Sequence, residues 1–361
     1  MYGAIISLAI AISVYVAEKY FLRKKMSPEI MWEGLFWGIL TGLVGARLFH
    51  VISLWSFYEV NPTLIIQFWQ GGLNIFGGIL GFLVAISLYL KSKKQKVLPW
   101  LDVAAQVTPL GQALGRWANY INKEIYGPET NLPWGINING YKHHPLFLYE
   151  MILDLWLFSL LILIKTKVKK VKKGTFLYVY LAGYSTIRIL LEDFRLQKWE
   201  WRSLNITNTI ALVLIVYAGT MLFKIYRKRL NVKLIFKALA TTGIIISLYL
   251  TYTKISGVEP LCGVGTCEIV QNSRYATMLG IPTALYGVFY YIVFYILAEK
   301  SLNKQLSLLI LVGLIFSAYL AYLELFIINA FCKWCVGSLL VILLASGIQY
   351  IRIKYDNIHN R

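Results

Sequence analysis

The sequence predicts an all-α polytopic membrane protein with about eleven transmembrane helices, arranged as a seven-helix domain followed by a four-helix bundle. Apolar residues form 58% of the 361-residue chain and charged residues only 15%, against about 45–50% and 25% in an ordinary globular domain. The apolar residues lie in stretches of about 20, which is the length that crosses a bilayer core as a helix. Composition therefore excludes a soluble enzyme and a secreted disulfide-rich domain.

Eleven apolar stretches qualify as candidate spans. Their approximate ranges are 2–22, 34–55, 72–90, 100–115, 147–164, 175–191, 206–223, 234–252, 281–298, 306–327 and 336–350. We do not expect the first stretch to be a cleavable signal peptide, because its charges follow the apolar run and no small-residue cleavage site appears.

The charge pattern predicts how these spans are oriented. The chain has 36 Lys and Arg against 17 Asp and Glu, a net charge of +19. A nucleic-acid-binding protein gathers such charge on one polar face, whereas here it lies in short runs after the odd-numbered spans, so no nucleic-acid partner is expected. Under the positive-inside rule these runs are cytoplasmic. The sequence thus predicts a protein of the bacterial cytoplasmic (inner) membrane, with its N-terminus outside and its C-terminus inside.

The best domain boundary is the basic stretch 224–233. All four cysteines follow it, whereas most of the arginines that lie within or beside apolar spans precede it. An ionisable group at membrane depth is costly and usually marks a site or a paired charge. We therefore expect two membrane domains, 1–233 and 234–361, each with its own site on the outer side.

The cysteines form two pairs that the predicted topology places on the outer side. Cys262 and Cys267 lie in the loop after the eighth span, and Cys332 and Cys335 open the eleventh. Outside the cytoplasm thiols can cycle through disulfides, and a helix N-terminus favours the thiolate of the first cysteine. Two such pairs can exchange disulfides as a relay.

Two alternatives to a relay remain. The pairs could be structural disulfides, although C-x-x-C is a strained and reducible geometry. Four cysteines could also hold zinc, but no hydrophilic knuckle surrounds either pair, and we expect no metal.

The cysteine spacing, together with Ser273, Gly280-Ile281-Pro282 and Gly287, resembles the bacterial vitamin K epoxide reductase family over about 234–350. This resemblance implies a four-helix bundle around a quinone, either ubiquinone or menaquinone. It also implies that electrons pass from a thioredoxin-like extracytoplasmic protein to the loop pair, then to the C-x-x-C pair, then to the quinone.

The same resemblance implies a role for each cysteine. Cys262 would meet the partner protein, Cys267 would attack Cys332, and Cys335 would face the quinone.

Other residues of this domain would surround the quinone. Ser273 would hydrogen-bond a quinone oxygen or steady the cysteines, and Tyr286, with Phe289 and Tyr290, would line the ring pocket unless these aromatic residues only pack. The family often has a tyrosine four residues after the last cysteine. Leu339 stands there in this chain and removes that hydrogen-bond donor.

The first domain carries polar residues suited to an anionic lipid. Arg116 begins a loop with Asn119, Asn122 and Glu124, whose arginine and amide groups bind phosphate and hydroxyl oxygens. Later in the chain His144 precedes the fifth span, and Arg188, Glu192 and Arg195 end the sixth. Arg188 and Glu192 share one helical face, and such a pair can also be a structural ion pair.

Seven short motifs in 1–225 resemble the prolipoprotein diacylglyceryl transferase family. They are Tyr2-Gly3, Gly45-Ala46-Arg47, Gly71-Gly72, Gly77-Gly78, Gly115-Arg116 with Asn119 and Asn122, His144-Pro145, and Arg188 with Glu192 and Arg195. The resemblance implies transfer of diacylglycerol from the membrane lipid phosphatidylglycerol to the lipobox cysteine thiol of a prolipoprotein.

This second resemblance also implies residue roles. Arg116 and Arg195 would hold the phosphate and neutralise charge on the leaving group. The residues that would bind the glycerol or support these contacts are Tyr2, Arg47, Asn119, Asn122, Glu124, Arg188 and Glu192.

One departure affects the expected chemistry. The family has a histidine before Gly77-Gly78, and this chain has Phe76. Either His144 or an arginine then carries the proton chemistry, or the first domain is a non-catalytic lipid-binding scaffold. A third hypothesis is a solute transporter, but the sequence lacks the repeat of broken helices that is typical of transporters.

The predicted topology can be tested on intact cells. A membrane-impermeant maleimide, added after reduction, should label both cysteine pairs because they face outward. Labelling that occurs only after lysis would contradict the topology and the redox assignment with it.

Overall fold

The computed structural model describes residues 2–168, 170–201, 204–227, 230–260, 267–330 and 332–359. Within these ranges, eleven helices of at least 17 residues follow one another, one at each predicted span. They are α1 (Tyr2–Arg23), α2 (Pro28–Ser53), α4 (Ile75–Ser92), α5 (Val97–Ile121), α6 (Leu146–Lys167), α7 (Thr175–Glu192), α8 (Ile206–Tyr226), α9 (Val232–Ser256), α11 (Thr283–Glu299), α12 (Asn303–Tyr322) and α13 (Lys333–His359). The all-α prediction is confirmed.

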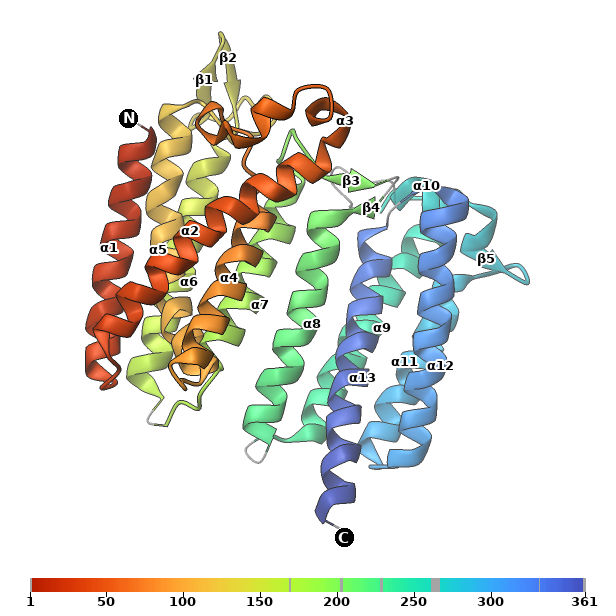
Figure 1. Cartoon of the computed structure of the whole chain (residues 1–361). Helices are drawn as coiled ribbons and strands as arrows, with labels where there is room; N and C mark the ends of the chain where they lie inside the picture. The colour runs from red at the N-terminus through yellow and green to blue at the C-terminus, as the bar shows by residue number, and fades with distance from the viewer. Residues whose placement is uncertain are drawn as a thin grey trace.

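Short elements join the long helices. The helical ones are α3 (Trp55–Tyr58), η1 (Pro62–Ile66), η2 (Phe68–Gln70), α10 (Cys267–Asn272), η4 (Arg274–Ala276) and the π-helical η5 (Leu323–Ile328). Three antiparallel hairpins pair β1 (Ile136–Ile138) with β2 (Tyr141–His143), β3 (Glu200–Trp201) with β4 (Leu204–Asn205), and β5 (Thr277–Met278) with β6 (Ile281–Pro282). These hairpins lie toward one end of the bundle (Figure 1).

Eight helices within the described ranges are long and apolar enough to cross a membrane, judged by length and composition. The helix α11 is apolar but shorter, at 17 residues. The helices α5 and α7 are more polar because they bury side chains such as Asp102, Gln106 and Glu192 inside the bundle. The chain is therefore a multi-pass membrane protein whose most polar helices face its own interior.

The helices form two groups that meet along α8 and α13 (Figure 1). The first group runs from α1 to α8, and the second contains α9, α11, α12 and α13. The two ends of the chain lie at opposite ends of the bundle, as an odd number of spans requires. The C-terminal ends of α1, α4, α6, α8 and α11 lie at the same end as the end of α13, opposite the hairpins (Figure 1).

Each group has its own apolar core. In the second group Tyr291, Phe294 and Ile342 pack together with Phe223, which α8 contributes from the first group. In the first group the cluster around Trp100 joins α1, α2, α4 and α5. The helix α8 thus belongs to the sequence of one group and helps to build the core of the other.

Glycines let α2 and α4 pack with their backbones almost in contact. A Cβ atom at Gly77 would lie 2.3 Å from the carbonyl oxygen of Gly45 and 2.4 Å from the Cβ of Phe49. Apolar burial does not drive helices together in lipid, so close packing of small residues is a main source of their association. The paired glycines of the sequence motifs therefore act here as a helix-packing surface.

This packing surface predicts a difference between neighbouring positions. Gly77→Ala should lower the free energy of unfolding by about 1–3 kcal/mol, the usual cost of overpacking. Gly78→Ala is the matched control, because its Cβ would meet no atom closer than 3.5 Å. Thermal unfolding in detergent measures both, and an equal loss of stability would contradict the proposed contact.

Candidate functional sites

Three arginines surround one buried carboxylate in the first group of helices. Glu150 of α6 is fully buried. Its Oε1 lies 3.1 Å from Arg188 Nη1 and 2.6 Å from Arg195 Nη2, and its Oε2 lies 3.0 Å from Arg116 Nη1. Arg116 comes from α5, Arg188 from α7, and Arg195 from the segment directly after α7. The Glu150 side chain therefore ties three helices together.

A second carboxylate extends this cluster. Glu192 accepts a hydrogen bond from Arg188 Nη2 at 3.0 Å and lies 3.8 Å from Arg195 Nε. Its other oxygen accepts from the Asn205 side chain at 3.0 Å. Asn205 also caps the N-terminus of α8 by accepting from the backbone N–H of Asn208. The cluster thus reaches α8, the helix shared by both groups.

The arginine cluster carries unsatisfied polar groups. Three guanidinium groups face the carboxylates of Glu150 and Glu192, and a further carboxyl, Asp154, lies one turn along α6 with both oxygens buried. Among the described residues, Arg116 Nε and Arg195 Nε have no hydrogen-bond partner. The three arginine side chains remain 15–17% exposed. The two unpartnered Nε atoms are themselves buried, so an anion from outside the bundle would meet the exposed part of these side chains.

The amide residues after Arg116 divide into two groups. Asn119 is buried, and its side-chain oxygen accepts from Arg116 Nη1 at 3.4 Å, so it belongs to the cluster. Asn122 is exposed and donates to Glu124 at 3.2 Å, away from the guanidinium contacts given above. Only the first of the two predicted glycerol-binding amides contacts an arginine.

His144 lies beside the cluster rather than in it. Its Nδ1 lies 3.1 Å from the hydroxyl oxygen of Tyr149, which also accepts a hydrogen bond from the Trp134 indole at 2.9 Å. The imidazole packs on Phe194, which directly precedes Arg195. The ring is therefore fixed near the arginines with one nitrogen hydrogen-bonded.

The remaining predicted residues of this half lie elsewhere. Arg47 donates to a set of backbone carbonyls, including Ile65 at 2.9 Å and Gly71 at 2.6 Å, and so shapes the segment between α2 and α4. Tyr2 begins α1, and its side chain lies outside the described part of the structure. Phe76 packs on Trp199 with ring centroids 4.9 Å apart.

The second site combines two thiols with a carboxylate. Cys332 and Cys335 are free thiols. The carboxylate of Glu324 and the two sulfur atoms lie within 4.8 Å of one another. Cys267 is disulfide-bonded, and Cys262 lies outside the described residues.

The structure brings Cys267, the described cysteine of the first pair, to the C-x-x-C pair. Cys267 and Cys332 are both fully buried in one cluster, with Val270 and Ala330. Cys267, predicted from sequence to lie in a loop, begins the short helix α10 and packs in the same cluster as the first cysteine of C-x-x-C. Behind the pair, Trp334 packs on Tyr249 of α9.

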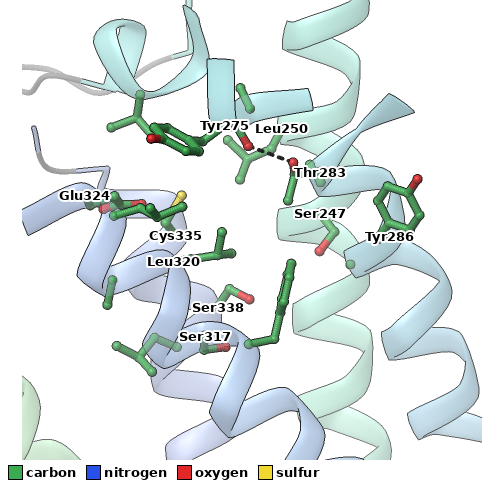
Figure 2. Close-up of a pocket in the computed structure, with 18 of the residues that line it drawn as sticks. Ser247, Leu250, Tyr275, Thr283, Tyr286, Ser317, Leu320, Glu324, Cys335 and Ser338 are labelled. Atoms are coloured by element: carbon green, nitrogen blue, oxygen red, sulfur yellow. Dashed lines mark hydrogen bonds between the residues drawn. The ribbon is translucent and has the colours of Figure 1, made fainter. Parts of the chain in front are cut away.

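A cavity of about 370 Å³ opens beside the second cysteine of C-x-x-C. Cys335 and Glu324 line one wall, and Ser247 and Thr283 line the opposite wall (Figure 2). Most of its surface is apolar, which suits a hydrophobic ring.

The predicted ring-binding residues partly match this cavity. Ser273, Tyr286, Tyr290 and Leu339 line it. Ser273 donates its hydroxyl to the carbonyl of Val270 at 2.7 Å, and Tyr286 donates to Met278 at 3.2 Å. Phe289 is 61% exposed and does not line the cavity.

One ion pair joins the two halves next to both sites. Lys333, between the two cysteines of C-x-x-C, contacts the carboxylate of Asp193. Asp193 directly follows Glu192 of the arginine cluster. The two sites therefore lie near one another, at the same end of the bundle (Figure 1).

Three acidic residues are the main elements of the sites that sequence reasoning missed. Glu150, Asp154 and Glu324 lie inside apolar spans, where an ionisable group is expensive. The acidic residues predicted from sequence, Glu124 and Glu192, share a short motif with an arginine. Treating every acidic residue within a span as a candidate would also have identified Glu150, Asp154 and Glu324.

The fold and sites define a polytopic membrane protein with a buried arginine–carboxylate cluster in one half and a cysteine-pair site in the other. Residues 1–224 match the family model of prolipoprotein diacylglyceryl transferase. The chain belongs to this family. Residues 234–349 match the vitamin K epoxide reductase family, so the chain is a fusion of the two.

Curated relatives of the first half carry one name, phosphatidylglycerol–prolipoprotein diacylglyceryl transferase. The protein of Finegoldia magna is 36% identical over 229 residues, which cover 63% of this chain and 92% of that protein. Those of Thermosynechococcus vestitus and Clostridioides difficile are 32% and 34% identical, covering 62% and 64% of this chain and 88% and 91% of theirs. The likeness thus extends over nearly the full length of these relatives.

The role of Glu150 can be tested by removing its charge. Glu150→Gln should lower the free energy of unfolding by about 3–5 kcal/mol, because it leaves buried guanidinium groups without their counter-charge. Thermal unfolding in detergent measures the loss. In the control Glu33→Gln the carboxylate is 54% exposed and pairs with Lys93, so the shift should be much smaller. Equal shifts would show that Glu150 does not organise the cluster.

Proposed function

We propose that residues 1–233 transfer diacylglycerol from phosphatidylglycerol to the lipobox cysteine thiol of a prolipoprotein. The arginine cluster is the observation that carries this proposal, because it gathers in one place three partly exposed arginine side chains, whose guanidinium groups are hydrogen-bond donors. A lipid phosphate is an anion that enters from the membrane and matches such donors. The names of the relatives from three bacteria point to the same reaction.

In this reaction a carbon–sulfur bond forms between the lipobox cysteine and diacylglycerol, the carbon–oxygen bond between diacylglycerol and the phosphate breaks, and glycerol phosphate leaves. Arg116 and Arg195 contact the phosphate and stabilise the charge that grows on its oxygen in the transition state. The thiol must lose its proton. The His144–Tyr149 pair lies beside Phe194 and the cluster, and is the group of this half suited to accept that proton.

The alternative is that this half binds lipid without catalysing transfer. Phe76 favours it, because a phenyl ring packed on Trp199 can neither accept a proton nor bind a headgroup. The intact arginine cluster favours transfer, since a scaffold needs no convergence of three arginines on one carboxylate.

Replacing one arginine by lysine tests the phosphate contact. Arg116→Lys keeps the charge but loses the planar fork, so it should lower the rate of transfer about tenfold or more, a loss of about 1.4 kcal/mol. The measurement is lipidation of a lipobox peptide in vesicles that contain phosphatidylglycerol. A rate equal to that of the wild type would refute the headgroup assignment.

The substitution Phe76→His distinguishes a catalytic transferase from a non-catalytic lipid-binding scaffold. If Phe76 weakens an active enzyme, the histidine should raise the rate of lipidation. Restoration from an inactive wild type would identify a degenerate transferase. If neither form lipidates the peptide while phosphatidylglycerol still co-purifies, the scaffold alternative is correct.

For residues 234–361 we propose a quinone-linked oxidation of thiols to disulfides. Its support is the apolar cavity beside Cys335, whose volume of about 370 Å³ lies within the about 300–1,000 Å³ of ligand sites. A quinone, ubiquinone or menaquinone, would be held there by Tyr286, Tyr290 and the wall at Ser273, and would supply the oxidising equivalents. Electrons reach Cys332–Cys335 from the loop pair, which a thioredoxin-like extracytoplasmic protein reduces.

The proposed setting is the bacterial cytoplasmic membrane, with the N-terminus outside. Both sites lie at the end of the bundle opposite the basic turns (Figure 1). Under the positive-inside rule this end faces outward, where prolipoproteins and thiol partners are exposed.

A trapping experiment tests the order of the relay. In Cys335→Ser the resolving thiol is gone, so a mixed disulfide between Cys267 and Cys332 should accumulate and be seen by mass spectrometry of non-reduced peptides. Cys262→Ser should block reduction by the partner protein yet leave Cys332 and Cys335 able to exchange with small dithiols. Equal and total loss in all four single mutants, with no trapped species, would support structural disulfides instead.

A further inference from the structure

Glu324 is a buried carboxylate in the redox half that none of the proposed steps uses. Its residue is 5% exposed. It lies in η5, the π-helical turn that ends the α12 segment ahead of C-x-x-C. Single π-helical turns inside α-helices are uncommon and frequently mark functional sites.

The surroundings of Glu324 place its carboxylate against the reacting sulfurs. Its Oε2 accepts the backbone N–H of Cys332 at 3.2 Å. Both sulfur atoms lie within 4.8 Å of its carboxylate group. Glu324 also lines the cavity on the same wall as Cys335 (Figure 2). One side chain therefore touches the thiols and faces the proposed quinone space.

Within the described part of the chain, no cationic side chain neutralises the charge of this carboxylate. Among the described residues, no Lys, Arg or His forms an ion pair with Glu324. Glu150, by contrast, is matched by three arginines. Burying a carboxylate in an apolar setting is costly, and leucine would fill the same volume in a membrane helix without that cost. The geometry suits a group that exchanges protons.

The chemistry of the site requires such a group. When two thiols form a disulfide, an S–S bond replaces two S–H bonds, and two electrons and two protons leave. Reduction of a quinone to its quinol takes up two electrons and two protons. The electrons travel between Cys335 and the quinone, but each proton needs a carrier in a site from which water is largely excluded.

We propose that Glu324 is a catalytic residue of the redox half, which takes the proton of the Cys335 thiol and delivers it to the reduced quinone. The proposal rests on the quinone-linked function given above. The Cys335 thiolate would then supply electrons to the quinone while the sulfur of Cys332 closes the disulfide and gives up its own proton. Because both sulfur atoms lie within 4.8 Å of the Glu324 carboxylate, Glu324 carries this second proton to the quinone in the same way. Both protons lost by the thiols thus reach the quinol, and Glu324 ends the cycle as it began.

Two substitutions at Glu324 separate proton transfer from a structural role. Glu324→Gln keeps the length and an oxygen that accepts the Cys332 N–H, but it cannot take a proton. Glu324→Asp keeps the carboxylate, but it is one methylene shorter and weakens that hydrogen bond. Glu268→Gln is the matched control, because Glu268 is an exposed carboxylate directly after Cys267.

The assay uses the full chain in detergent, with dithiothreitol as the thiol donor and short-chain ubiquinone and menaquinone analogues as acceptors. Quinol formation gives the rate, and equilibrium binding gives the Kd for each quinone. Glu324→Gln should lower the rate about 100-fold or more, in the range of general acid–base catalysis, with an unchanged Kd. Glu324→Asp should retain more activity than Glu324→Gln, and Glu268→Gln should match the wild type.

A Glu324→Gln variant that is more active than Glu324→Asp would overturn the proposal. If Glu324 only holds the Cys332 backbone, glutamine is the better replacement and Glu324→Asp loses more activity. A rate of quinol formation in Glu324→Gln equal to that of the wild type would also overturn the proposal. A wild type that binds and reduces neither quinone would refute the quinone-linked function itself. The role of Glu324 as a proton carrier would then be refuted as well.

Discussion

The cost of placing a carboxylate inside a membrane protein organises the first half of this molecule. Glu150 is fully buried, and three arginines from α5, α7 and the segment after α7 converge on it. A buried charge without a partner is costly, so each of these groups fixes the position of the others. The cluster thereby sets the spacing of the helices and presents guanidinium groups where a lipid phosphate arrives. Stability and recognition use the same side chains.

In the redox half, by contrast, the buried carboxylate is not paired with a cation in the described part of the chain. Its cavity is apolar, and its one buried carboxylate beside the thiols, Glu324, has no cationic partner among the described residues. A matched charge would hold the proton state of the carboxylate fixed, whereas an unmatched one is free to change it. The two halves thus use buried glutamates differently, for a permanent ion network in one and for proton exchange in the other.

The helices could be predicted from sequence because the signal is local. A run of apolar residues that spans a bilayer folds as a helix whatever its neighbours, since lipid leaves the backbone no other partners. The cysteine pairs and Arg116 could also be found, because their spacing is contained in short motifs. The eleven predicted spans all correspond to helices in the structure.

The remaining features depend on contacts between distant segments. Arg47 is expected from its motif to bind the glycerol or to support the headgroup contacts. Its guanidinium instead contacts backbone carbonyls that only the folded segment between α2 and α4 supplies. The convergence on Glu150 joins residues 34 to 45 positions apart. The π-helical turn that aims Glu324 at Cys332 has no sequence signature of its own.

The ion pair between Lys333 and Asp193 has a consequence for biosynthesis. These residues are separated by 140 positions, and chains fold from the N-terminus as they are made. The end of α7 is therefore synthesised long before α13. Asp193 cannot form its ion pair with Lys333 while α8, α9, α11 and α12 enter the membrane. The ion pair beside the arginine cluster can therefore form only after α13 of the redox half has been made. A chain truncated before α13 would keep the arginine cluster but lack this neighbouring ion pair.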